Sequence, residues 1–478
     1  MNKILLIIIL ILSLYYRFWD APHRYGIGGD GSRDALVAFE AIRQIQLPAT
    51  GPFSSIGPIT FGPWYYYLNI LSSIVIPSPW APWIGIGIAS LGMVIVMYRI
   101  GVLLNHTKLG LILALLAASS PAQISSSTNL QPHALIGFLT SLVLYIFIQL
   151  AQEKENIRLF TLWGFIIGVS ILTHYQTVGL LTLPILYFLL NRRIIFLLRF
   201  LFGFIISLIP TLFFELNNHW FNLRNIIDYL RFGQYRVWTS NRWLTYAGKF
   251  WPEFWSFVIG TPFAVSLFFM TASIIILSVI FFKKRKATPL FLILISFLIE
   301  VVILRYYRGE KFFGYLQFFH PYIYIITGYV FLILSKTLKY KFILFTLIAI
   351  YIILTIPNSL KHMQYDPLNS DTRIRIDTLK NNIASSKFST YYCTKVYDKD
   401  RVQALLLMLY MNKMYDENGY KIAISNPACH SSSSIELSNN IIDVNNSSEG
   451  ALLSEGIIPL SPRGIYNEVA RWWMDEKP

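Results

Sequence analysis

The chain has 478 residues, of which 55% are hydrophobic, 16% aromatic and only 14% charged, a profile that excludes an ordinary soluble globular protein. The net charge of +15 lies in residues 1–357, which hold 27 Lys and Arg against 11 Asp and Glu. Positive charge spread through the apolar part of a chain excludes a soluble nucleic-acid binder and suits a membrane protein with an anionic substrate.

Apolar stretches throughout residues 1–357 predict membrane-spanning helices, so the expected fold is an all-α polytopic membrane protein. The eleven predicted spans are residues 4–19, 82–104, 109–120, 131–151, 158–173, 176–190, 194–214, 262–282, 288–305, 315–335 and 341–357. Several are shorter than the roughly 20 residues that a straight span needs. No small-residue cleavage site follows the first stretch, which predicts a retained helix and not a signal peptide.

Residues 61–76 are also apolar, but an aromatic cluster opens them and Pro77 and Pro79 follow. These features favour a helix at the membrane interface over a further span. With a cytoplasmic N-terminus, every cytoplasmic turn is then basic; if residues 61–76 crossed the membrane, the basic run 283–286 would move outside. The sequence therefore predicts a multi-pass cell-membrane protein whose C-terminal region is extracytoplasmic.

The predicted outer face collects the long loops, which are residues 20–81, 121–133, 215–260 and 306–314. In the first loop, apolar side chains at helical spacing predict an amphipathic helix over residues 32–46 on the membrane surface. These side chains are Leu36, Phe39, Ile42 and Ile45. Loop 215–260 interleaves cations with five tryptophans of interfacial type and predicts one or two surface helices. The tryptophans are Trp220, Trp238, Trp243, Trp251 and Trp255.

Residues 358–478 form a second, more polar part of the chain. A β-like run over 421–425 and a helical run over 402–414 predict a small extracytoplasmic α/β domain, with residues 1–357 as the transmembrane domain. Cys393 and Cys429 both lie in this part. A disulfide between them is as compatible with the sequence as two free thiols.

Two carboxylates and an arginine follow the first predicted span within five residues, as Asp30, Arg33 and Asp34. Carboxylates are costly near a bilayer and often mark a functional site there. Flanking glycines would let a substrate approach Asp30 closely. In the alternative interpretation, Asp30 or Ser32 caps the helix over 32–46, and Asp34 stabilises that helix through its dipole.

Other polar side chains gather at the predicted outer rim. Arg308, Lys311 and Tyr315 are candidates for binding a lipid-linked phosphate, or else for ordinary contact with lipid headgroups. Glu215 and His174 are candidate substrate contacts, or alternatively a helix cap and a satisfied interfacial side chain. The sequence contains no P-loop, nucleophile elbow or metal-ligand spacing. Because the spans hold few charges apart from Glu300, an enzyme at the membrane surface is favoured over a transporter.

In their order, four features resemble the polyprenyl-phosphate-sugar-dependent glycosyltransferases of the GT-C class, in the RgtA/B/C/D-like branch related to protein mannosyltransferases and the aminoarabinose transferase. They are the acidic segment Gly29-Asp30-Gly31-Ser32-Arg33-Asp34-Ala35, the run from Gly51 to Gly62-Pro63-Trp64-Tyr65-Tyr66-Tyr67, Ser120-Pro121 with Asn129-Leu130-Gln131-Pro132-His133, and the Arg- and Tyr-rich edge before the penultimate span. One departure is that Asp30-Gly31 stands where family members often have Asp-Glu.

The resemblance implies a GT-C-like fold and transfer of a sugar from a polyprenyl phosphate to an acceptor hydroxyl, with inversion. It implies catalytic roles for Asp30 and Asp34 and substrate contacts from Arg33 and Tyr66, in addition to the rim residues. The partners expected are the lipid-linked sugar donor, membrane lipids, and a lipid, glycan or protein acceptor, with no nucleic acid. The missing second acid argues against a metal site, the sequence leaves a divalent cation such as Mg²⁺ or Mn²⁺ open, and no other cofactor is expected. The alternative function is a lipid or sugar transporter, or flippase, without chemistry.

Overall fold

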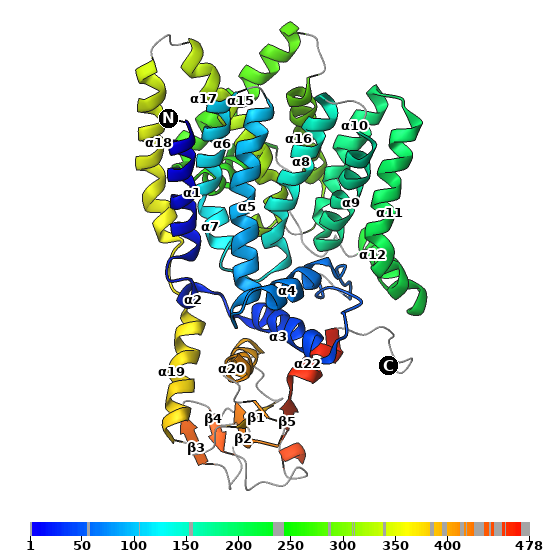
Figure 1. The fold of residues 1–478 in the computed structure, drawn as a ribbon, viewed down its shortest axis with the longest axis vertical. Helices are drawn as coiled ribbons and strands as arrows, with labels where there is room; N and C mark the ends of the chain where they lie inside the picture. Colours follow the sequence, from blue (N-terminus) through cyan, green and yellow to red (C-terminus); the bar gives the residue numbers. More distant parts are fainter. Residues whose placement is uncertain are drawn as a thin grey trace.

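A computed structural model describes residues 2–469 except 55–57, 105, 153–155, 233–242, 285–287, 308, 310, 338–340, 383–386, 394–398, 412–414, 417, 425–434, 439–440, 444–451 and 455. A bundle of long apolar helices forms the larger part (Figure 1). A smaller region with a β-sheet lies at one end of the bundle, and two short helices, α3 and α4, lie between the two parts.

The helices of the bundle occur where the apolar stretches predict them. They are α1 (Asn2–Phe18), α5 (Ala81–Leu103), α6 (Thr107–Ala118), α8 (Ile136–Gln152), α9 (Ile157–Thr173), α10 (Thr182–Leu190), α11 (Ile194–Asn217), α15 (Phe263–Lys284), α16 (Pro289–Tyr306), α17 (His320–Thr337) and α18 (Lys341–Lys361). Short helical pieces connect them: α2 (Ala21–Arg24), α7 (Pro121–Ser126), and the 3₁₀ helices η1 (Pro132–Leu135), η2 (Tyr175–Leu181) and η5 (Phe313–Phe319).

The predicted polytopic helical fold is confirmed. Within the described residues, five helices are long and apolar enough to cross a membrane, and a bent pair over Trp243–Ile259 and Phe263–Val279 adds a sixth if it is one span. Other predicted spans, such as α6 and α9, are shorter apolar helices. Residues 61–76 contain only α4 (Trp64–Val75), which is too short to be a span and lies across the end of the bundle (Figure 1).

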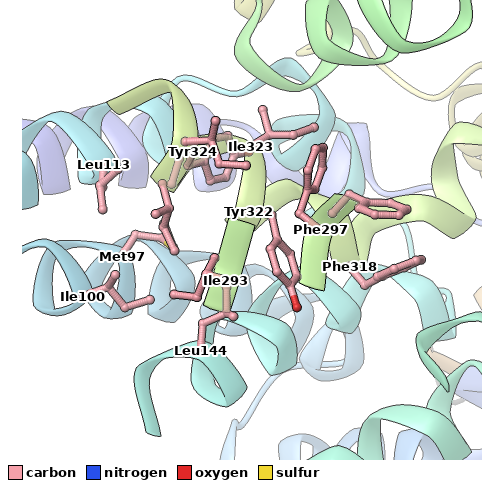
Figure 2. Close-up of a cluster of buried hydrophobic side chains, with 14 of the residues drawn as sticks. Met97, Ile100, Leu113, Leu144, Ile293, Phe297, Phe318, Tyr322, Ile323 and Tyr324 are labelled. Carbon is pink, nitrogen blue, oxygen red and sulfur yellow. The ribbon is translucent and has the colours of Figure 1, made fainter. Parts of the chain in front are cut away.

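The bundle encloses a close-packed apolar core. Side chains from α5, α6, α8, α16, η5 and α17 meet there (Figure 2). Members of this core include Met97, Ile100, Leu113, Leu144, Ile293, Phe297, Phe318, Tyr322, Ile323 and Tyr324. Such packing holds the helix ends, and therefore the connecting loops, in fixed positions.

One charge inside the bundle was not expected from the sequence. Arg17 is only 1% exposed, and its guanidinium donates to the carbonyls of Ala117 and Ala118, both at 3.0 Å, and to Ser90 Oγ at 2.8 Å. Ala118 ends α6, where helix carbonyls lack partners within the helix. Arg17 therefore satisfies a helix end and ties α1 to α5 and α6.

The loop over residues 215–260 differs from its prediction. It forms α12 (Phe221–Arg231), then α13 (Trp243–Thr245), a π-helical turn η4 (Tyr246–Phe250) and α14 (Trp251–Ile259). Trp251 and Trp255 belong to the bundle core, with Trp255 fully buried, so their prediction as interfacial residues is wrong. The reason is that α14 packs against α15 and α17 and not against lipid. Trp238 lies outside the described residues.

The C-terminal region, residues 367–469, combines helices with a sheet, as the sequence predicts. Its helices are α19 (Pro367–Asn382), α20 (Lys399–Met411) and α22 (Pro462–Val469), and its strands are β1 (Phe388–Cys393), β2 (Tyr420–Ile424), β3 (Ile435–Ser438), β4 (Ile441–Asp443) and β5 (Ile457–Leu460).

The strand order in this sheet is β3-β4-β2-β1-β5. Only β1 and β2 pair in parallel, and α20 supplies the crossover that a parallel pair requires. Cys393 at the end of β1 is disulfide-bonded, and the other cysteine of the chain, Cys429, lies outside the described residues. The predicted domain boundary at 357/358 stays a prediction, since α18 runs through it.

Candidate active site

The acidic segment begins a helix that starts earlier than predicted. Helix α3 covers Gly29–Gln44, its N-cap is Gly28, and no side chain caps it. Asp30 is already in the first turn, while the Ser32 hydroxyl donates to the carbonyl of Ile27 at 2.6 Å. The capping alternative for Asp30 and Ser32 is therefore wrong. A Cβ at Gly31 would lie 2.7 Å from the carbonyl oxygen of Gly26, so this position needs glycine for close packing.

Asp30, Arg33 and Asp34 form one ion-paired group, which we call the α3 triad. Arg33 Nη1 lies 2.7 Å from Asp30 Oδ1, and Arg33 Nε lies 2.8 Å from Asp34 Oδ1. The exposed fraction of the side chain is 59% for Asp30, 11% for Arg33 and zero for Asp34. The two acids therefore differ in environment. Asp30 is exposed to solvent, whereas Asp34 is buried and pairs with Arg33 from the protein interior.

Tyr66 completes the buried side of the triad. Its hydroxyl donates to Asp34 Oδ1 at 2.8 Å, and Tyr66 itself is fully buried on α4. Burial raises the pKa of Asp34, while Arg33 and the Tyr66 hydroxyl act in the lowering direction. Burial alone would lower the pKa of Arg33, but Asp34, Tyr66 and Asp30 together raise it well above its usual value. The guanidinium therefore stays charged, and the Asp34 carboxylate joins α3 to α4 through its bond from Tyr66.

Three aromatic rings from separate segments lie close together. They are His133 of η1, His174 after α9 and Tyr315 of η5, with ring centroids 5.0 Å apart for His174 and Tyr315 and 5.6 Å for His133 and Tyr315. Phe61 stacks on His174 at 5.2 Å. The structure therefore brings the predicted residues His174 and Tyr315 together.

The loop between α6 and α8 fixes the segment before α3. The amide of Gly26 donates to the carbonyl of Thr128 at 3.0 Å, and Gly26 pairs with Asn129 in an isolated parallel bridge. The indole of Trp83 donates to the carbonyl of Gly26 at 3.1 Å. The second outer loop and α5 therefore hold the start of α3 in place.

The remaining predicted substrate contacts bond to other parts of the protein or lie outside the residues that the structure describes. Both oxygens of Glu215 accept backbone amides at the start of α12, from Asn222 at 3.2 Å and from Leu223 at 3.1 Å. This is the helix-capping alternative for Glu215, and its carboxylate is engaged there, not at the α3 triad. Lys311 donates to the carbonyl of Tyr307 and lies 5.8 Å from that ring. Arg308 lies outside the described residues.

The α3 triad does not fit a divalent cation. Such ions need several oxygen ligands, but one oxygen of each carboxylate already pairs with Arg33, and Asp34 is fully buried. In the described part of the chain, no three His, Cys, Asp or Glu side chains group as metal ligands. No step proposed below uses a metal, and the Mg²⁺ or Mn²⁺ left open by the sequence stays untested.

Sequence reasoning left two of these aromatic residues without a role. His133 belongs to a motif of the second outer loop, and Phe61 opens an aromatic cluster that resembles an interfacial anchor. Their only sequence signal is polar or aromatic character next to helix breaks at Pro132 and Pro63. What brings them to Tyr315 and His174 is packing between segments distant in the sequence, which local patterns do not encode.

Part of the sequence and the overall fold are similar to known proteins. Residues 62–214 match the family model described as dolichyl-phosphate-mannose-protein mannosyltransferase, and no curated protein matches the chain. The structure is similar to ArnT from Cupriavidus metallidurans bound to undecaprenyl phosphate, with a TM-score of 0.62 and 11% identity over 92% of this chain and 98% of that one.

Similarity also extends to the oligosaccharyltransferase of Archaeoglobus fulgidus, seen in complex with Zn and sulfate, with a TM-score of 0.54 and 16% identity over 78% of this chain and 55% of that one. The chain therefore spans just over half the length of the archaeal enzyme. A second structure of the archaeal oligosaccharyltransferase, in complex with an inhibitory peptide and a dolichol-phosphate, is also similar. Its TM-score is 0.50, with 14% identity over 80% of this chain and 58% of that one. The resemblance predicted from the sequence is confirmed at the level of the fold, which is that of these membrane glycosyltransferases.

Proposed function

We propose that this protein is a membrane glycosyltransferase that moves a sugar from a polyprenyl-phosphate-linked donor to an acceptor hydroxyl, with inversion, on the extracytoplasmic face. The observation that carries the proposal is the α3 triad, in which an exposed carboxylate and a charged guanidinium lie side by side at the end of an apolar bundle. The fold shared with transferases and the family match over residues 62–214 support the same reaction class.

Asp30 is the proposed general base. An acceptor hydroxyl is a poor nucleophile and needs its proton removed as it attacks the sugar, and Asp30 is the triad carboxylate that reaches solvent. The hydroxyl oxygen bonds to the anomeric carbon, the bond from that carbon to the phosphate oxygen breaks, and the phosphate leaves with the electron pair. Attack from the side opposite the phosphate inverts the anomeric carbon.

Arg33 is the proposed partner of the leaving phosphate. Negative charge grows on that phosphate during transfer, and a fixed cation stabilises it without a general acid. Arg33 uses Nε for Asp34 and Nη1 for Asp30, so two carboxylates hold its guanidinium in one orientation. Asp34 is then a positioning residue, because it holds the guanidinium while being fully buried itself.

The pH dependence of transfer tests this role of Asp34. Ionised Asp34 is needed to hold Arg33, and burial raises its pKa, so turnover should fall as the pH drops through that raised value. The Tyr66 hydroxyl lowers the pKa of Asp34, so Tyr66→Phe should move the acid limb of the pH–turnover curve to higher pH. Tyr67→Phe is the matched control, since the Tyr67 hydroxyl donates to the carbonyl of Pro48 instead. An unmoved acid limb in Tyr66→Phe would contradict the assignment.

The proposed orientation places the C-terminal region outside the cell. Three observations support it: the basic turns, the disulfide at Cys393, and the position of the N-terminus at the end of the bundle opposite this region (Figure 1). A membrane-impermeant thiol reagent on intact cells should label Leu453→Cys, at an exposed residue of that region. Lys108→Cys, in a predicted cytoplasmic turn, should react only after permeabilisation. The reverse labelling pattern would overturn the orientation.

The decisive experiment for the function is sugar transfer by purified protein. Incubation with polyprenyl-phosphate sugars and candidate acceptors, followed by mass spectrometry, should show a glycosylated acceptor and free polyprenyl phosphate in equal amounts. Movement of the donor between vesicle leaflets without any product would favour the transporter alternative. Comparison of surface glycans in cells with and without the protein would identify the acceptor class.

A further inference from the structure

Helix α3 lies between the membrane bundle and the C-terminal region (Figure 1). On one side it packs against α4, and on the other against α20 and α22. The triad residues are near its N-terminal end, while the contacts with the C-terminal region extend along the rest of the helix. The C-terminal region therefore packs against the same helix that carries Asp30 and Arg33.

Glu40 is the buried charge at this contact. Its side chain has no exposed surface, and its oxygens accept from Tyr410 of α20 at 3.2 Å and from Gln44 at 3.0 Å, with Arg43 Nε at 3.5 Å. A buried carboxylate is costly unless it is paired and hydrogen-bonded. Glu40 lies ten residues after Asp30 on the same helix and takes no part in the proposed reaction.

The bond from Tyr410 to Glu40 belongs to a wider set of contacts. The ring of Tyr410 stacks on Phe39 at 5.9 Å with an interplanar angle of 4°, and the hydroxyl of Tyr466 donates to the carbonyl of Gln46 at 2.8 Å. Before α3 in the chain, the side-chain Nδ2 of Asn369 donates to the backbone carbonyls of Pro22 and Tyr25 at 2.8 and 3.0 Å. The C-terminal region thus contacts the chain both before the acidic segment and after it.

We propose that the C-terminal region positions the α3 triad for catalysis, and that Glu40 and Tyr410 are the positioning residues through which it acts. This inference rests on the proposed transferase function. A helix held from one side only would keep its fold and lose the fixed direction of Asp30 and Arg33. Since turnover depends on near-attack geometry, such a loss reduces turnover more than it reduces donor binding.

Two changes test the contact in the full-length protein. Tyr410→Phe removes the hydroxyl and keeps the ring on Phe39, and Glu40→Leu removes the carboxylate. We expect each to lower kcat by about tenfold to a hundredfold with little change in the KM for donor and with thermal unfolding near that of the wild type. Glu40→Gln still accepts a bond from Tyr410 and should keep most of the turnover. Tyr365→Phe is the matched control, because that hydroxyl donates to Asp20 Oδ2, outside α3.

Hydrogen exchange of the amides over residues 29–36 gives a second readout that needs no substrate. Exchange there should be faster in Tyr410→Phe and Glu40→Leu than in the wild type or Tyr365→Phe. Unchanged exchange, or unchanged kcat in both variants, would overturn the positioning role. If the wild type transfers no sugar while exchange responds as expected, the proposed reaction fails and the coupling of the C-terminal region to α3 stands.

Discussion

Asp30→Asn is expected to lower turnover at least ~10²-fold while leaving folding and donor binding nearly intact, because an amide cannot accept the proton of the acceptor hydroxyl. Asparagine keeps the size of the side chain and still accepts a hydrogen bond from Arg33. Asp30 caps no helix and is 59% exposed, so its structural contribution is small. The measurement is the rate of sugar transfer from donor to acceptor by the purified variant, with its thermal unfolding recorded alongside.

Asp20→Asn is the matched control for this change. Asp20 lies in the same outer segment and pairs with His23 and Tyr365, so the variant removes an exposed carboxylate that the mechanism does not use. Its turnover should match the wild type. Near-normal turnover in Asp30→Asn would remove Asp30 as the base. An inactive Asp34→Asn would not by itself transfer that role, because Asp34 is fully buried and holds Arg33.

Local pattern was sufficient to predict α3 but not its exact extent. Leu36 lies on the buried face that the apolar spacing indicates, with no exposed surface. Ile45 fits the same spacing, yet it is 95% exposed, because it is the C-cap in a left-handed conformation with φ of 53° and so leaves the helical face. Spacing identifies a helix face, whereas the ends of a helix depend on backbone conformations that spacing does not encode.

The sequence could not predict that one of the two acids of the α3 triad is buried and the other exposed. Asp30 and Asp34 are one helical turn apart in the chain, and nothing in their spacing indicates which of them is buried. What buries Asp34 is α4, through a hydrogen bond from Tyr66 across 32 positions of sequence. The same holds for Trp251 and Trp255, whose composition resembles interfacial anchors but whose burial follows from packing against the bundle. In each case, packing between segments distant in the sequence determines whether the side chain is buried.

The second large effect concerns Arg33. Arg33→Met is expected to lower turnover at least ~10²-fold and to destabilise the protein by about 3–5 kcal/mol, the usual cost of leaving a buried charge without its partner. Asp34 would then keep only the Tyr66 hydroxyl as a hydrogen-bond donor among the described contacts, with its second oxygen buried and unsatisfied. Arg375→Met is the control, since it breaks an arginine–carboxylate pair of the same length to the exposed Asp371 and should change stability by about 1 kcal/mol or less.

The double variant Arg33→Met/Asp34→Asn separates stability from catalysis. An amide at position 34 can still accept the Tyr66 hydroxyl and carries no charge that needs a partner, so most of the lost stability should return. Turnover should not return, because the cation proposed for the leaving phosphate is still missing. Stability is read from chemical denaturation of the two single variants and the double variant as one cycle, and turnover from sugar transfer. Recovery of both stability and turnover would mean that Arg33 acts only as a structural partner of Asp34, and the phosphate site would then have to lie elsewhere on the outer rim, for example at Lys311.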